Sequence, residues 1–245
     1  MNRTAQDKMS EGMFMDIIEE ICTWEIKPPH LCPFLTNEPF ADNRIYDFCK
    51  LVNEYLPKTS IVFFTNGSLF TDANLDRLKG VQNISTIHVS LHHSNKTEYE
   101  ADLGLIWEKT LVSVHRLIDR QRWPVKLLRV QSGDKAKDLE FTAFCGREFP
   151  GTPVQLSYRY NWKGDITSPF GYENTLDIIC PRHQSLTILC DGRVSLCCLD
   201  ESGEYSLGDF KKDRLIDIYN SPLALSYRTR VKRWSEPCSK CNHHA

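Results

Sequence analysis

Apolar residues along positions 10–160 follow two patterns in turn, a helical stripe and a short continuous run. Met13, Ile17 and Ile21 recur at helical spacing, which predicts a helix with one apolar face. Residues 30–36 then form a short apolar run, which is typical of a strand buried on both faces. The pattern therefore predicts a helix followed by a buried strand.

The same succession repeats up to residue 160. Asp42 is expected to cap the next helix, and Asn66-Gly67 is expected to end the next strand. The predicted helices cover residues 41–56, 71–78, 97–120 and 137–149, and the predicted strands cover 60–65, 85–91, 124–131 and 153–160. Strands that alternate with helices imply right-handed crossover units and a parallel sheet, either open or partly rolled.

The pattern changes after Trp162. Residues 161–174 are rich in turn-forming residues, and residues 185–198 contain two β-type runs joined at Asp191-Gly192, which predicts a hairpin. Residues 213–234 show helical periodicity interrupted at Pro222. We therefore predict two domains, residues 1–165 and 166–245.

Composition narrows the class of protein. The chain has 245 residues, of which 41% are hydrophobic and 25% charged, and it contains no apolar run long enough to cross a membrane. The first twelve residues are polar and show no signal-peptide core, so a soluble cytoplasmic protein is expected, with no membrane partner. A net charge of −2 gives no electrostatic signature of nucleic-acid binding.

Six of the ten cysteines lie between residues 180 and 241, where closely spaced thiols in a reducing compartment favour a metal site. Cys238 and Cys241 form a C-x-x-C pair, and Cys180 and Cys197 are the best candidates for the other two ligands. Four thiolates suit tetrahedral zinc or an iron–sulfur cluster.

The remaining cysteines receive other roles. Successive side chains of a strand point to opposite faces, so Cys197 and Cys198 are not expected to share the site. Cys198 is predicted to be structural, and Cys190 is an open alternative expected to pack. The four cysteines outside this region are predicted to be small buried apolar residues: Cys22, Cys32, Cys49 and Cys145.

The C-terminal cysteine pattern consists of C180-x16-C197, a glycine between these two cysteines, and a later C-x-x-C. This pattern resembles the auxiliary-cluster region of radical S-adenosylmethionine (radical SAM) enzymes. That region is called SPASM in its seven-cysteine form and twitch in its four-cysteine form, and this sequence is similar to the shorter one. The resemblance implies one auxiliary [4Fe–4S] cluster bound by Cys180, Cys197, Cys238 and Cys241. His243 and His244 follow directly and offer further ligand atoms.

The resemblance extends to the first 160 residues. "TNEPF" after a predicted strand resembles the family motif that binds the amino group of S-adenosylmethionine, with Asn37, Glu38 and Pro39 in the motif positions. Thr65 and Asn66 end the next strand, and Ser90 stands where the family often contacts the cofactor ribose. The implied fold is α/β: an incomplete parallel (β/α)6 partial barrel, similar to a TIM barrel, plus a small cysteine-rich hairpin-and-helix domain.

The family's radical-forming motif C-x-x-x-C-x-x-C is absent from this sequence. Two explanations compete: truncation of a complete enzyme before Met1, which we favour, and a natural relative without the motif. A sheet that lacks its first strand exposes an apolar edge, so under truncation we expect the chain to be poorly soluble or to need a partner.

The resemblance implies an oxidoreductase that cleaves S-adenosylmethionine to a radical, with a peptide or small-molecule substrate and a reductase as electron donor. The alternative is a non-catalytic module that holds structural zinc or an electron-relay cluster. Polar side chains near predicted strand ends are further active-site candidates, each with the alternative of an ordinary core or loop role: His88, His92, His93, Arg129, Gln131 and Arg159.

Overall fold

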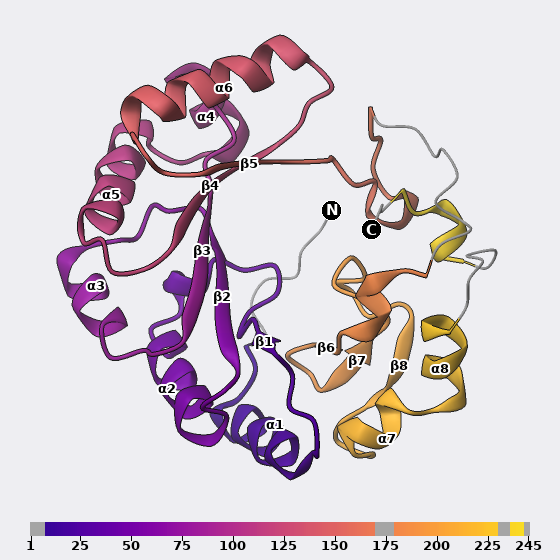
Figure 1. Cartoon of the computed structure of the whole chain (residues 1–245). Helices are drawn as coiled ribbons and strands as arrows, with labels where there is room; N and C mark the ends of the chain where they lie inside the picture. Colours follow the sequence, from indigo (N-terminus) through magenta and orange to yellow (C-terminus); the bar gives the residue numbers. More distant parts are fainter. Residues whose placement is uncertain (1–7, 170–178, 230–235, 243–245) are drawn as a thin grey trace. The chain divides into compact units, whose positions relative to one another are not determined.

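The structure, a computed structural model, describes residues 8–169, 179–229 and 236–242 (Figure 1). Contacts divide the chain into two compact units, one of residues 26–159 and one that joins residues 1–25 to 160–245. We call them the sheet unit and the cysteine unit. The division after Arg159 lies close to the predicted boundary at residue 165, but it groups the first helix with the C-terminal residues.

The sheet unit is built on five parallel strands that lie in sequence order, β1-β2-β3-β4-β5. The strands are β1 (His30–Leu31), β2 (Ser60–Thr65), β3 (Ile84–Ser90), β4 (Val125–Val130) and β5 (Val154–Ser157). Sequential parallel strands joined by helices are the connectivity of a (β/α) barrel, here left open. The predicted α/β class is confirmed.

Helices connect these strands and lie along one side of the sheet (Figure 1). They are the 3-10 turn η1 (Pro39–Ala41) and the helices α2 (Ile45–Tyr55), α3 (Asp72–Leu78), α4 (Lys96–Leu103), α5 (Trp107–Asp119) and α6 (Lys135–Glu148). Because they cover one face, alternate strand residues differ in burial. On β2, Ile61 and Phe63 are fully buried, whereas Phe64 is 43% exposed.

Four details of the prediction are wrong. The strand expected over 30–36 is only two residues long, and the strand over 60–65 is not buried on both faces. The helix expected over 97–120 is two helices, because Gly104 adopts a left-handed conformation and ends α4. Asp42 does not cap α2: its Oδ1 accepts from the N–H of Arg44, which precedes the helix.

The strand end at Asn66-Gly67 is sterically specified. Gly67 has a positive φ of 77°, and a Cβ there would lie 2.7 Å from Cγ1 of Val89 and 2.9 Å from Cγ2 of Val114. Only glycine fits both the backbone conformation and the space. The turn that the sequence marks is therefore also a close packing point between β3 and α5.

The cysteine unit has a small antiparallel sheet, β6-β7-β8. Its elements are α1 (Glu11–Thr23), η2 (Trp162–Gly164), η4 (Pro181–Gln184), β6 (Thr187–Ile188), β7 (Arg193–Ser195), β8 (Ser206–Asp209), α7 (Leu215–Tyr219), α8 (Pro222–Arg228) and η5 (Cys238–Lys240). The predicted hairpin is present as β6 and β7, with Gly192 at φ 92° in its turn. Glu20 of α1 accepts a hydrogen bond from the N–H of Ile216, one of the donors that the start of α7 leaves without a helical partner.

Some expectations concern residues outside the described ranges. They include His243 and His244, the middle of the turn-rich segment after Trp162, and the helical prediction beyond Arg228. Among the described residues, no helix is long and apolar enough to cross a membrane.

Candidate functional site

The four cysteines with the predicted ligand spacing line one small pocket of the cysteine unit. Cys180 precedes η4, Cys197 follows β7, and Cys238 and Cys241 bracket the single turn of η5. All four are buried, with exposed fractions of 6% to 8%. The fold thus brings thiols from three separate segments to the same place, as the predicted ligand set requires.

The pocket keeps the Cys197 thiol protonated when no metal is present. Burial raises the pKa of Cys197 to about 12. The neighbouring cysteines act in the same direction, whereas a backbone hydrogen bond at Leu199 lowers the pKa. Only a thiolate binds metal, so binding here must release the Cys197 proton.

The cysteines outside the predicted set lie in different environments. Cys198 is half-buried and its sulfur accepts a hydrogen bond from Nη1 of Arg182 at 3.3 Å. Cys190 is exposed, so the expectation that it packs is wrong, because it lies in the turn that joins β6 to β7. Cys49 and Cys145 are fully buried as expected, but Cys32 is exposed.

The pocket fits an iron–sulfur cluster in its donor set. Its described wall residues are the four cysteines, three apolar residues (Leu196, Leu199 and Pro237) and three basic residues (Lys163, Arg182 and His183), and thiolates are the ligands of [4Fe–4S] clusters. Among the residues that the structure describes, no three His, Cys, Asp or Glu side chains converge closely enough to hold a single metal ion. The four ligands of a cubane cluster bind four different irons, so they surround a core instead of sharing one ion.

Sequence reasoning missed several residues of this pocket wall. Lys163 and His183 both line it and are 7% and 8% exposed. Nε2 of His183 lies 3.6 Å from the Cys238 sulfur, and its Nδ1 lies 3.1 Å from the Tyr227 carbonyl oxygen, to which it must donate. The sequence signal for these contacts was weak, since a lysine in a turn and a single histidine are common.

A pair of asparagines fixes the C-x-x-C turn. The N–H of Asn161 donates to Oδ1 of Asn242 at 2.7 Å, and the N–H of Asn242 donates to Oδ1 of Asn161 at 3.1 Å. Nδ2 of Asn161 also donates to the Lys240 carbonyl. Both asparagines are buried, so these bonds hold residues 161–164 against the turn that carries Cys238 and Cys241.

The predicted cofactor-binding residues of the sheet unit meet at the ends of β1 and β2. Oε1 of Glu38 accepts from the hydroxyl of Thr65 at 2.7 Å, and Oε2 accepts from the N–H of Asn66 at 2.7 Å. Oε1 also accepts from the N–H of Phe40. Glu38 therefore ties the loop after β1 to the end of β2, with its carboxylate already engaged by this chain.

The other predicted residues of that set are placed as follows. Asn37 is exposed beside Glu38, Pro39 is buried as the first residue of η1, and Ser90 is the last residue of β3. Asn66 uses its Oδ1 to accept from the N–H and hydroxyl of Ser68. These side chains thus come from the loop after β1 and from the ends of β2 and β3, and parallel strands end on the same side of a sheet.

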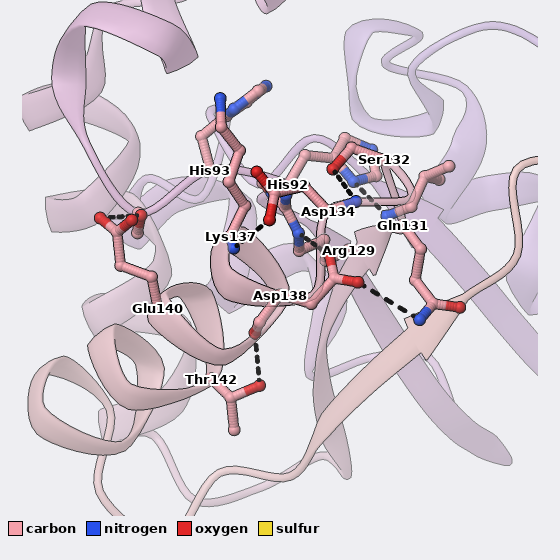
Figure 2. Close-up of polar contacts among 12 residues, drawn as sticks. His92, His93, Arg129, Gln131, Ser132, Asp134, Lys137, Asp138, Glu140 and Thr142 are labelled. Carbon is pink, nitrogen blue, oxygen red and sulfur yellow. Dashed lines mark hydrogen bonds and ion pairs between the residues drawn. The ribbon is translucent and has the colours of Figure 1, made fainter. Parts of the chain in front are cut away.

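A second polar cluster lies at the ends of β3 and β4 (Figure 2). Nε of Arg129 donates to Oδ1 of Asp138 at 2.7 Å, with side chains 5% and 7% exposed, and Nη1 donates to the His92 carbonyl. Nε2 of Gln131 donates to the other oxygen of Asp138 at 3.3 Å. Arg129, a predicted active-site candidate, is therefore paired with a carboxylate of this chain.

His92 is neutral in this cluster. Its Nδ1 accepts from the N–H of Val130 at 3.1 Å, and it has a positive φ of 61°. Burial lowers the pKa of His92 from 6.5 to about 4. The charges of His93 and Arg129 act in the same direction, and that of Asp102 opposes them. It joins the end of β3 to β4.

His93 and His88 differ from His92. Nε2 of His93 lies 2.9 Å from Oδ2 of Asp102, and its Nδ1 lies 3.5 Å from Oε2 of Glu98. His88 stacks on Phe64 with ring centroids 4.5 Å apart, and burial, then Lys126, lowers its pKa. His88 and Phe64 are paired across β3 and β2 on the face of the sheet that the helices leave open.

Comparison with known proteins agrees with the cysteine pocket. Residues 180–242 match the SPASM family, described as an iron-sulfur cluster-binding domain. The matched range contains all four pocket cysteines. Residues 180–242 are therefore similar to an iron–sulfur cluster-binding domain, in agreement with the resemblance seen in the cysteine spacing. No curated protein sequence matches the chain.

The chain is similar in fold to several solved structures. It is similar to BtrN in complex with AdoMet and 2-DOIA, with a TM-score of 0.64, 15% identity, and coverage of 99% of this chain and 84% of BtrN. It is similar to anSMEcpe with bound AdoMet, with a TM-score of 0.68, 13% identity, and coverage of 91% and 72%. It is also similar to SuiB of Streptococcus suis bound to precursor peptide SuiA, with a TM-score of 0.68, 12% identity, and coverage of 98% of this chain and 64% of SuiB. At these identities the shared property is the fold.

Proposed function

We propose that this chain is a radical SAM-type oxidoreductase, or a part of one, whose Cys180, Cys197, Cys238 and Cys241 bind one auxiliary [4Fe–4S] cluster. The observation that carries the proposal is the pocket itself: four buried thiols from three segments line it, within the region that matches an iron–sulfur cluster-binding domain. A bound cluster supplies electron transfer, and the chain supplies ligands and a wall that limits water.

The second part of the proposal concerns S-adenosylmethionine. The cofactor-binding residues are Asn37, Glu38, Pro39, Thr65, Asn66 and Ser90, at the carboxyl edge of the sheet, where ligands of parallel α/β folds bind. Glu38 supports this role by fixing the Asn66 backbone through a 2.7 Å hydrogen bond. The sequence holds no C-x-x-x-C-x-x-C, so no residue is assigned to a radical-forming cluster.

The substrate class follows only in outline. Of the similar structures, SuiB is bound to a precursor peptide and BtrN to 2-DOIA. We therefore propose a peptide or a small molecule as substrate, a reductase as electron donor and the cytoplasm as location.

The test is the content of iron, sulfide and zinc after anaerobic reconstitution. We expect about four irons with matching sulfide per chain, and loss of both in Cys238→Ala. Cys198→Ala is the matched control, because Cys198 neighbours a predicted ligand but bonds to Arg182, and it should keep the full content.

Two results would contradict the proposal. Zinc without sulfide would leave the non-catalytic zinc module as the function. Equal iron loss in Cys198→Ala and Cys238→Ala would show that the ligand set is wrong. Isothermal calorimetry with S-adenosylmethionine then tests the cofactor site, where Glu38→Gln should weaken binding and Glu140→Gln, an exposed carboxylate on α6, should not.

A further inference from the structure

Lys163 is a buried cation in the wall of the thiol pocket. Its side chain is 7% exposed, and the residue lines the pocket together with the four predicted ligands. Lysine is rarely buried to this degree without a specific partner. No role for it follows from the ligand set alone.

The backbone around Lys163 is held in an unusual conformation. Trp162, Lys163 and Gly164 have φ values of 47°, 65° and 96°, all in the left-handed region. Such residues persist only where surrounding contacts impose them. Here the Asn161–Asn242 bonds impose them, and a Cβ on Gly164 would approach Cβ of Lys240 to 3.1 Å.

The same segment covers the thiols with apolar surface. Trp162 packs against the buried group of Cys197, Leu199 and Cys241. The conformation of residues 161–164 therefore places the Trp162 ring against the buried cysteines and Lys163 in the wall of the pocket.

The ammonium has defined partners. Nζ donates to Oδ2 of Asp165 at 2.7 Å and to the Leu199 carbonyl at 3.2 Å, and it lies 4.0 Å from Oδ1 of the fully buried Asp200. Burial favours the neutral amine, but Asp165, Asp200 and Glu204 outweigh it and raise the pKa of Lys163. The side chain is therefore charged at neutral pH.

We propose that Lys163 is the counter-charge of the iron–sulfur site and sets its reduction potential, a role that rests on the cluster proposed above. Four thiolates give an oxidised [4Fe–4S] centre a net negative charge, and reduction by one electron adds another. A cation in a weakly screened wall stabilises the reduced form more than the oxidised form. Lys163 thus raises the potential, as does Arg182, which also lines the pocket, and the carboxylates of Asp165 and Asp200 offset part of the effect of Lys163.

The experiment is a potentiometric titration of reconstituted protein, followed by electron paramagnetic resonance, with dithionite as reductant. Each sample takes up one electron per cluster, and the potential at half reduction is compared at one pH. The variants are Lys163→Met, Lys163→Arg and Asp165→Asn. Each is first shown to hold the same iron and sulfide as wild type.

The predicted shifts have opposite signs. Lys163→Met should shift the potential to a more negative value, Lys163→Arg should stay near wild type, and Asp165→Asn should shift it to a more positive value. Asp165 is 44% exposed, so its variant is expected to fold and tests the proposal even if Lys163→Met does not.

The proposal is overturned if Asp165→Asn and Lys163→Met leave the potential unchanged or shift it in the same direction. A wild-type protein that holds no cluster is a separate result, because it overturns the proposed function before any variant is compared.

Discussion

The sheet unit and the cysteine unit satisfy their buried polar groups in different ways. In the sheet unit the polar groups bond to one another: Glu38 with Thr65 and Asn66, and Arg129 with Asp138. In the cysteine unit the predicted ligands line a pocket. A closed network is complete without a ligand, whereas thiols around a pocket gain their strongest bonds when metal arrives. The first region should therefore fold independently of metal, and the second should depend on it.

The largest effect is expected when the hydrogen-bond network of the sheet unit is broken at Arg129. Arg129→Met leaves the Asp138 carboxylate buried without its main partner, at a cost of about 3–5 kcal/mol in the free energy of unfolding. Urea denaturation measures the loss. The double variant Arg129→Met/Asp138→Leu should recover most of it, because no uncompensated charge remains. Iron content should not change, and a fall in iron would contradict the independence of the two regions.

Removal of the metal should act on the other region. Chelation of the reconstituted protein is expected to lower amide exchange protection in β6, β7 and β8 about 100-fold, or about 3 kcal/mol. Protection in β2, β3 and β4 should stay the same. Hydrogen exchange with mass spectrometry reads both sheets in one sample, and equal loss in both would contradict the comparison.

A pH effect should appear in the sheet unit. Because the folded state lowers the pKa of His92 from 6.5 to about 4, the unfolded chain binds more protons between these values. The free energy of unfolding should therefore fall as the pH drops from 6.5 to 4, by at most about 3 kcal/mol, and not change above pH 6.5 from this cause.

His92→Asn is the control for that effect. Asparagine tolerates the left-handed backbone of residue 92 and offers an oxygen to the N–H of Val130, but it does not titrate in this range. The free energy of unfolding of this variant should not show the fall between pH 6.5 and pH 4 that His92 causes. An unchanged slope would assign the pH dependence to other groups.

The smallest expected effect concerns the hydrogen bonds that hold the C-x-x-C turn of the cysteine unit. Asn161→Ala removes hydrogen bonds to Asn242 and Lys240 and is expected to cost about 1–3 kcal/mol. Bound iron should also pass to a chelator faster than in wild type, since the C-x-x-C turn loses its support. Asn53→Ala, which removes a side-chain bond at the edge of the sheet unit, should leave the rate unchanged.

The sequence predicts local features well where one residue decides them. Residues 60–65 form the predicted strand, Thr71 caps α3 through the N–H of Asn74, and Gly192 makes the hairpin turn. The short strand β8 has no such signal, because "SLGD" carries neither alternation nor length. The predicted ligand cysteines rest on their spacing and on the alternation of strand faces, which separates Cys197 from Cys198.

The sequence says less about contacts that join distant segments. Lys163 lies in a stretch that reads as a turn-rich linker, and its burial depends on Asn242, almost eighty residues away. The Glu38 carboxylate is chemically suited to bind a cofactor amine. In the fold it joins the loop after β1 to the end of β2. Both are tertiary effects, and no local pattern records them.

The most direct test of the central claim is the Mössbauer spectrum of protein reconstituted with 57Fe, for wild type and for Cys180→Ser. The account predicts that the wild-type iron gives the spectrum of one [4Fe–4S] cluster per chain with sulfur ligands, and that Cys180→Ser loses most of it. Wild-type iron without a cluster spectrum, or an identical spectrum in Cys180→Ser, would contradict the claim that these four thiols hold an iron–sulfur cluster.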